Sequence, residues 1–388
     1  MKDFLRRPRI FGFLALIFIA AAIFSVIGAP FKSEAVEKRE LLASINGCLS
    51  SSGKNTCFKS LAGEWIRRDN IDKVFNLVEE NQETPGIFEN CHVMLHFLGQ
   101  AAYKKYGDVT ETLKRGSHAC FAGFYHGTLE GYFIENNLSV YTEDDTAKLK
   151  EMIPAICLEE KAEIRKDYLE CLHGLGHAFM FATDGELPLA LNLCDALGES
   201  EKARWCYSGA FMENSTSTTN PDHPSKYLKA DDPLYPCSIL ENKYLNTCYI
   251  LQSMHIVDKT KADWPAVATF CRQIPEAYRK ACFDGMGQSL SGFSTDHTVI
   301  RDVCLSVETE YLKECIEGVV GAIGAKYNPP FSKVLDFCSV WSNEEKSMCY
   351  EAAFDRMNNW PVNQRELRKF CATVNNSFLT ESCLSRLE

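Results

Sequence analysis

The stretch VATFCRQIPEAYRKACFDG, residues 267–285, contains the pattern that decides the fold. An apolar segment ends at Cys271, a polar connector follows, and Cys282 opens a second apolar-periodic segment. This pattern predicts two antiparallel helices, A and B. Because an antiparallel hairpin brings the end of helix A close to the first turns of helix B, we expect a disulfide between Cys271 and Cys282.

The same unit recurs along the chain. Cysteines lie eleven residues apart in four pairs and twelve apart in a fifth, and successive pairs begin 34, 33, 34 and 33 residues on. These pairs are Cys237 with Cys248, Cys271 with Cys282, Cys304 with Cys315, Cys338 with Cys349, and Cys371 with Cys383. Two further pairs, Cys157 with Cys171 and Cys194 with Cys206, extend the series with longer periods.

A period in the low thirties is typical of helical-hairpin repeats. The sequence therefore predicts an all-α, disulfide-stapled array of hairpins, an α-solenoid with a period of about 33–34 residues. This period resembles that of tetratricopeptide-type and Sel1-type arrays. Their Trp, Gly, Tyr and Ala signatures do not occur here at matching offsets, so the resemblance is one of architecture.

Glycine recurs three residues after the second cysteine of a unit, as CFAG at 120, CLHG at 171, CYSG at 206, CFDG at 282 and CIEG at 315. Glycine inside a helix costs about 0.5–1 kcal/mol relative to alanine, so this register predicts close approach of a neighbouring backbone. Cys48 and Cys57 lie nine residues apart in a loop with Gly and Ser. Cys91 and Cys120 are too far apart for a hairpin cross-link and both begin B-like segments, which favours a bridge between consecutive units.

The amino terminus has the pattern of an export segment. Residues 1–9 carry four basic groups and one acid, and residues 10–29 carry no charge. We predict a cytoplasmic basic tail at 1–9 and a transmembrane anchor at 10–29, with a cleaved signal peptide as the alternative. The rest of the chain would then be extracytoplasmic, on the periplasmic or cell-surface side, or secreted if the segment is cleaved.

Four further regions follow from composition and spacing. They are an N-terminal cap with the first helices at 30–85, His-rich helical repeats at 86–213, a Ser/Thr/Asn/Pro-rich loop and candidate boundary at 214–236, and regular Cys-paired repeats at 237–388. The formal charge of −11 becomes −14 once the +3 of residues 1–9 is removed. With no basic run in the exported part, nucleic acid is not an expected partner.

Six of the nine histidines fall in one short window, at His92, His96, His118, His126, His173 and His177. Two B segments carry His-x3-His, which places both rings on one helix face. His96, His126 and His177 lie five or six residues after their cysteines, so three neighbouring B helices would present imidazole at one level. These six histidines, together with Glu130 one turn beyond His126, form the predicted metal site.

Copper and zinc are the metals that suit these ligands best, with iron less favoured; Met94 and Met180 nearby would favour copper. Ligation by cysteine is disfavoured because the thiols are expected to be paired.

Three functions remain open. The first is a membrane-anchored extracytoplasmic repeat protein that binds a transition metal through the histidines. The second is a metal-free scaffold that holds a protein partner on the repeat surface. The third is a metal-dependent enzyme in which Glu130 acts as a base and His118 or Tyr125 relays protons, although the chain contains no HExxH, GxSxG, Walker A or GxGxxG motif.

Overall fold

The computed structural model describes residues 34–216, 225–374 and 376–387. These residues form nineteen α-helices, α2 to α20, and contain no β-strand. The predicted basic tail and anchor, residues 1–9 and 10–29, lie outside the described residues. Among the helices that are described, none combines the length and the apolar character needed to cross a bilayer.

The chain divides into two compact units, residues 1–47 and 48–388. The described part of the first unit belongs to helix α2 (Glu34–Leu49). All of the hairpins, disulfides and candidate ligands belong to the second unit.

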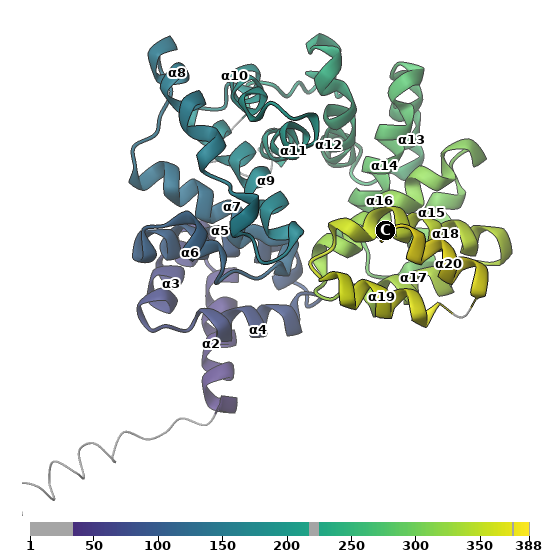
Figure 1. The fold of residues 1–388 in the computed structure, drawn as a ribbon, viewed down its shortest axis with the longest axis horizontal. Helices are drawn as coiled ribbons and strands as arrows, with labels where there is room; N and C mark the ends of the chain where they lie inside the picture. Colours follow the sequence, from purple (N-terminus) through teal and green to yellow (C-terminus); the bar gives the residue numbers. More distant parts are fainter. Residues whose placement is uncertain (1–33, 217–224, 375, 388) are drawn as a thin grey trace, which may run out of the picture. The chain divides into compact units, whose positions relative to one another are not determined.

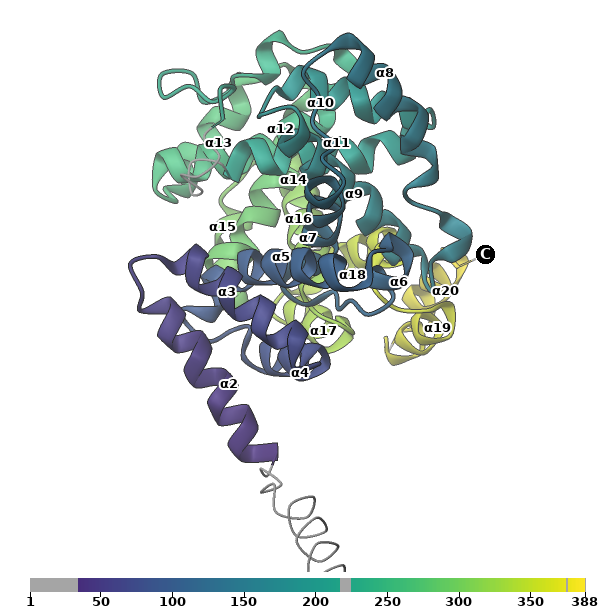
Figure 2. The ribbon, with the colours of Figure 1, turned by 90° about the vertical axis from the view of Figure 1, so that its left-hand side faces the viewer.

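The long B helices form the continuous layer of the second unit. They are α5 (Ile87–Tyr106), α7 (Ala119–Glu135), α9 (Arg165–Ala182), α11 (Ser200–Thr216), α12 (Asn242–Thr260), α14 (Glu276–Phe293), α16 (Leu312–Lys326), α18 (Asn343–Arg356) and α20 (Ser377–Ser385). Each packs against the next along the chain, and α3 (Lys54–Arg67) packs beside α5 (Figures 1 and 2). The predicted side-by-side arrangement of B helices is therefore present.

A further helix precedes most of the B helices and, except in the last hairpin, it is the shorter of the two. The C-terminal repeats have α13 (Trp264–Gln273), α15 (His297–Leu305), α17 (Phe331–Ser339) and α19 (Gln364–Thr373), and the N-terminal part has α4 (Ile71–Asn81), α6 (Val109–Leu113), α8 (Glu143–Met152) and α10 (Leu187–Cys194). The all-helical, disulfide-linked, repeat-like fold predicted from the spacing is confirmed in the described residues.

Nine disulfides join all eighteen cysteines. The fourteen cysteines of the repeats are paired as their spacing predicts: Cys157 with Cys171, Cys194 with Cys206, Cys237 with Cys248, Cys271 with Cys282, Cys304 with Cys315, Cys338 with Cys349, and Cys371 with Cys383. Such a set indicates an oxidising, extracytoplasmic or secreted environment.

The four remaining cysteines form two bridges whose pairing the spacing left open. Cys48 is joined to Cys57 across the connection between α2 and α3. Cys91 is joined to Cys120, and this bridge links α5 to α7, two neighbouring B helices. The bridge between consecutive units expected from the B-like context of both cysteines is therefore present.

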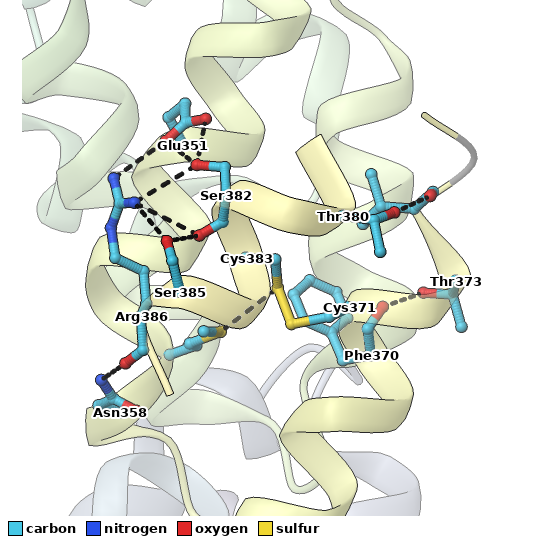
Figure 3. The surroundings of a disulfide bond; sticks show 12 residues. Glu351, Asn358, Phe370, Cys371, Thr373, Thr380, Ser382, Cys383, Ser385 and Arg386 are labelled. Carbon is cyan, nitrogen blue, oxygen red and sulfur yellow. Dashed lines mark hydrogen bonds and ion pairs between the residues drawn. A yellow bond between two sulfur atoms is a disulfide. The ribbon is translucent and has the colours of Figure 1, made fainter. Parts of the chain in front are cut away.

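The last hairpin shows how a cross-link is combined with polar contacts. Cys371 of α19 is bonded to Cys383 of α20, and beside it Ser382 donates to Glu351 of α18 at 2.8 Å (Figure 3). Arg386 reaches the same carboxylate at 3.1 Å. The disulfide therefore closes the hairpin, while the carboxylate ties it to the preceding B helix.

The second cysteine of each C-terminal hairpin lies in the first turns of helix B, as predicted. The helices begin before the apolar stretch that the cysteine opens, so Cys248, Cys282, Cys315 and Cys349 lie inside α12, α14, α16 and α18. Helix α14, for example, starts at Glu276, directly after Pro275 at its N-cap. The first turn of this helix is polar, so a search for apolar periodicity does not detect where the helix begins. The proline does mark the position, because it fixes φ and lacks an N–H and is therefore common at helix starts.

Two first cysteines also differ from the prediction that they end helix A. Cys157 and Cys237 lie outside any α-helix. Pro236 directly precedes Cys237, which begins a single 3₁₀ turn. Both cysteines still reach their partners in the following B helix, with Cα atoms 5.8 Å apart in each bridge.

The predicted loop at 214–236 is shorter than expected. Helix α11 continues to Thr216, residues 217–224 lie outside the described part, and residues 225–236 are irregular. The packing continues across this segment, because Tyr207 of α11 contacts Tyr244 of α12 edge-on, with ring centroids 5.0 Å apart. The loop thus connects two repeats that share one core.

The glycines allow neighbouring B helices to approach closely. A Cβ atom at Gly209 would lie 1.9 Å from the carbonyl oxygen of His173, and one at Gly318 would lie 1.9 Å from that of Asp284. Gly123, Gly174 and Gly285 likewise face the backbone of the preceding B helix. This is the role predicted from the Cys-x-x-Gly register, and in the N-terminal half it brings the histidine-bearing helices together.

Candidate metal centre

Five imidazoles from three adjacent B helices meet in one buried cluster. His92 and His96 come from α5, His126 from α7, and His173 and His177 from α9. His126 is central, because its ring centroid lies 5.2 Å from that of His92, 5.3 Å from that of His96, and 4.6 Å from those of both His173 and His177. We call these five residues the imidazole cluster.

Glycines place the rings of the cluster. Gly127 of α7 packs on the backbone of His96, where a Cβ atom would lie 1.9 Å from the carbonyl oxygen. Gly123 packs in the same way on His92, and Gly209 of α11 on His173. The helices therefore come close at the turns that carry histidine, because a side chain at these glycines would keep them apart.

A left-handed turn at the start of α7 adds to the local geometry. Cys120, Phe121 and Ala122 have φ values of 53°, 58° and 56°. Each such residue costs about 1–2 kcal/mol in a left-handed conformation. The bridge to Cys91 holds this turn, and the carbonyl oxygen of Cys120 accepts a hydrogen bond from His92 Nδ1 at 2.8 Å.

Every ring in the cluster has one nitrogen occupied by a group outside it. On α5, His92 Nδ1 donates to the Cys120 carbonyl and His96 Nδ1 contacts Oε1 of Glu130 at 2.9 Å. Since a carbonyl and a carboxylate only accept, both Nδ1 atoms carry a proton. The Nε2 atoms of the two rings face each other at 3.1 Å, a separation that fits a shared proton or a common metal ion.

The pair on α9 repeats this arrangement. His177 Nδ1 lies 2.9 Å from Oε2 of Glu213 on α11, and His173 Nδ1 lies 2.7 Å from the hydroxyl oxygen of Ser208. The Ser208 hydroxyl already donates to the carbonyl of Trp205, so it accepts from His173. The Nε2 atoms of His173 and His177 again face each other, at 3.2 Å.

The central ring follows the same rule. His126 Nε2 lies 3.1 Å from Oε2 of Glu170, whose other oxygen contacts Lys166 at 2.5 Å. His126 Nδ1 is buried and has no hydrogen-bond partner among the described residues. Each of the five rings therefore directs one nitrogen to an acceptor outside the cluster and leaves its other nitrogen free of such a partner.

These inner nitrogens fit a metal ion. A tetrahedral ion with nitrogen ligands at about 2.0–2.1 Å places neighbouring ligand atoms about 3.3 Å apart. The two Nε2–Nε2 separations of 3.1 and 3.2 Å are close to this value. Ligand atoms lie within 4.8 Å of one another in three groups: His92, His96 and His126; His126, His173 and His177; and Glu130, His177 and Glu213.

Burial favours the neutral form of three of the five rings. Burial, followed by the neighbouring imidazoles, lowers the pKa of His126 and His173 well below the usual value, and burial with His96 lowers the pKa of His92 to about 3. Burial opposes the charged form of His96 too, but Glu130 outweighs it and raises the pKa of His96. Although burial alone would raise the pKa of Glu130, contact with His96 lowers it. Neutral imidazole is the form that binds metals.

His118 and the two methionines lie apart from the cluster. His118 is at the N-cap of α7 before the left-handed turn, outside all three ligand groups, and its Nε2 contacts Asp167 at 2.8 Å. Tyr125 stacks on His118 and donates to the same carboxylate. The structure therefore does not bring His118 together with the other predicted ligands. Met180 packs in the hydrophobic core, and Met94 is also buried.

The sequence did not single out the carboxylates Glu170 and Glu213 or the hydroxyl of Ser208. Glu213 lies seven residues after Cys206, near the level of His126 and His177 in their own helices. Counting residues from the cysteine of the fourth B helix, as was done for the three histidine-bearing helices, would have identified Glu213. Glu170 directly precedes Cys171, and no spacing rule distinguishes it.

No protein-family model matches this chain, and neither do the curated proteins or the solved structures compared with it. Its function is therefore inferred from the site itself, a group of buried histidines and carboxylates that could hold a metal.

Proposed function

We propose that this protein is an exported helical-repeat protein that binds a transition metal ion in the imidazole cluster. The observation that carries the proposal is the set of acceptors around the rings. One nitrogen of each ring faces a carbonyl, a hydroxyl or a carboxylate, so the other nitrogen is the one available to a metal. Metal-binding histidines in proteins are generally oriented in this way, by an acceptor on the ring nitrogen that does not face the metal.

The ligand set favours zinc or copper. Each histidine group supplies three imidazoles, a combination that suits both ions, whereas carboxylate-rich sites suit iron and manganese. The main role of the Glu130 and Glu213 carboxylates is to orient His96 and His177. The same two carboxylates lie in a ligand group with His177 and are the nearest additional ligands.

A location outside the cytoplasm supports this proposal. In an oxidising compartment the eighteen cysteines are paired, so no thiolate is left to bind a metal. The histidines are then the strongest remaining ligands for zinc or copper. We further propose that residues 10–29 anchor the chain in the membrane, on the grounds of their uncharged sequence. A protein partner on the repeat surface, which would receive or present the metal, belongs to the same proposal.

The metal-free scaffold is the alternative. A single proton between each facing pair of Nε2 atoms would also relieve the contact of two lone pairs, so each pair would be an imidazole–imidazolium pair. This arrangement would give a polar core in a scaffold protein and no affinity for metals.

Metal analysis separates the two. The full chain, purified without reductant, is incubated with Zn(II) or Cu(II), freed of unbound ion and analysed by mass spectrometry of the elements. We expect at least one ion per chain, and less metal in His126→Ala, which removes the imidazole shared by both histidine groups. His118→Ala, which alters a buried histidine just before the same helix but outside the cluster, should keep the metal. Folded protein without metal above background would overturn the proposal.

A further inference from the structure

The cluster is built from two copies of one half-site. In each copy a B helix carries His-x3-His, the first ring donates to a neutral acceptor of the next B helix, and the second donates to a carboxylate of that helix. The carboxylates are Glu130 and Glu213, and the Nε2 atoms of each pair are separated by almost the same distance, 3.1 and 3.2 Å. Each pair has the geometry of two ligands on one ion.

The two pairs are too far apart to share one ion without rearrangement. The ligand atoms within 4.8 Å of one another include either His92 and His96 or His173 and His177, each with His126, and no group among the described residues contains both pairs. Nitrogen ligands held at about 2.0–2.1 Å from one ion lie at most about 4.2 Å from one another, so a set that exceeds 4.8 Å does not fit a single ion.

We infer that the imidazole cluster holds two transition metal ions, one at His92 and His96 and one at His173 and His177. This inference rests on the proposed function and extends it from binding to a two-ion centre. His126 lies between the two and has one unoccupied nitrogen, so it completes one site only.

A group of carboxylates adjoins the second half-site. Glu130 lies with Glu213 and His177 in a group whose ligand atoms are within 4.8 Å. On the α5 side, Glu130 accepts from the outer nitrogen of His96 and from Gln100, and it is not among the ligand atoms grouped with His92 and His96. Glu130 therefore orients the first pair and is a candidate ligand only beside His177.

The two half-sites differ in exposure. His92 and His96 are half-buried, and the His96 side chain retains 13% of its exposure. His126, His173 and His177 are all buried, with only 2% left to the His177 side chain. The ion on α5 is therefore the one that a chelator or a partner protein reaches, whereas the ion on α9 requires the helices to open.

Counting the ions in the full chain tests this inference. Zn(II) is titrated into chelator-treated, non-reduced protein, and bound zinc is measured per chain after gel filtration. We expect two ions in the wild type and one in both His92→Ala/His96→Ala and His173→Ala/His177→Ala. Chelation of the loaded wild type should remove one ion before the other, and the first-lost ion should be missing in the α5 variant.

Each other result has a defined meaning. One ion in the wild type, or loss of all zinc in both double variants, would overturn the two-ion inference and leave single-ion binding intact. Absence of zinc from folded wild-type protein would overturn the proposed function itself. The wild-type count does not depend on variants, so a variant that fails to fold leaves the test decisive.

Discussion

Glu213 Oε2 lies 2.9 Å from His177 Nδ1, and this carboxylate comes from α11, a helix without any histidine. The contact fixes the tautomer of His177 and directs its Nε2 toward His173. A carboxylate that accepts from the outer nitrogen of a ligand histidine raises the basicity of that ligand. The site therefore extends over a fourth B helix.

Glu213→Gln should weaken metal binding without unfolding the chain. The amide oxygen can still accept from Nδ1, but the negative charge is lost, and changes to groups that orient a ligand cost about 10–100-fold in affinity. Competition with a chromophoric chelator measures the change. Glu186→Gln, which alters a carboxylate bonded to Lys226 and Tyr227, is the control and should have no effect. Equal affinities for the two variants would remove Glu213 from the site.

The glycine register gives a second prediction. Gly127→Ala places a methyl group 1.9 Å from the His96 carbonyl oxygen, so α5 and α7 must separate. We expect a loss of about 2–3 kcal/mol in unfolding free energy, as for overpacked cores, and weaker metal binding. Gly321→Ala in α16, where no atom lies within 4 Å, should instead stabilise the protein by about 0.5–1 kcal/mol. Urea denaturation with the disulfides intact checks both. Similar shifts in both variants would contradict the close-approach role.

The hairpins and the meeting of the rings could be predicted from the sequence. The cysteine spacing predicted the hairpins, and the positions of His96, His126 and His177 relative to their cysteines predicted that the rings would meet, because neighbouring B helices share one register. The sequence did not separate His118 from the other histidines, because clustering alone says nothing of the backbone at residues 120–122, which is left-handed. A left-handed turn made of residues other than glycine cannot be recognised from the spacing of apolar residues.

The outer acceptors could not be predicted for a different reason. Glu170 and Ser208 contact the rings through pairings between helices 35–44 residues apart in sequence. A carboxylate or hydroxyl on a helix surface has the same sequence pattern whether it faces solvent or a neighbouring ring. Only the packing of α7 against α9, and of α9 against α11, distinguishes the two.

A buried lysine gives the protein a pH-dependent stability. Lys326 lies 4.1 Å above the ring of Phe88, while the nearby Glu83 contacts Lys333 at 2.7 Å and so joins distant parts of the chain. Burial lowers the pKa of Lys326 to about 8, below its value in the unfolded chain. Between pH 8 and about 10.4 the unfolded state therefore binds more protons, and stability rises with pH.

Lys326→Met should remove this dependence. We expect the wild type to gain about 2 kcal/mol between pH 8 and about pH 9.5, at about 1.4 kcal/mol per pH unit, and the variant to gain much less. Below pH 8 the variant should be the more stable of the two. Urea denaturation at several pH values measures the difference, with Lys369→Met, at an exposed position, as control. Parallel pH profiles for wild type and Lys326→Met would contradict the assignment.

The C-terminal half uses ion pairs at the level where the N-terminal half places histidine. Asp284 and Glu317 lie two residues after their cysteines, as His173 does, and both contact Arg356 of α18, at 2.6 and 3.4 Å. Burial opposes the charge of Arg356, but Asp284 and Glu317 outweigh it and raise its pKa. In the C-terminal half, the Arg356 guanidinium is thus the cation that lies between the acidic side chains.

Arg356→Ala should therefore be destabilising and have no effect on metal. Removing one partner of a fully buried pair costs about 3–5 kcal/mol, and the loss here should be smaller because the Arg356 side chain is 30% exposed and Asp284 keeps its hydrogen bond from Gln288. Replacing Asp284 with Ala in the same chain should recover part of this loss, so the two changes are less than additive in a double-mutant cycle. Zinc content per chain should equal that of the wild type in every folded variant. Loss of metal in Arg356→Ala would show that the two halves are coupled and that the cluster depends on the C-terminal ion pairs.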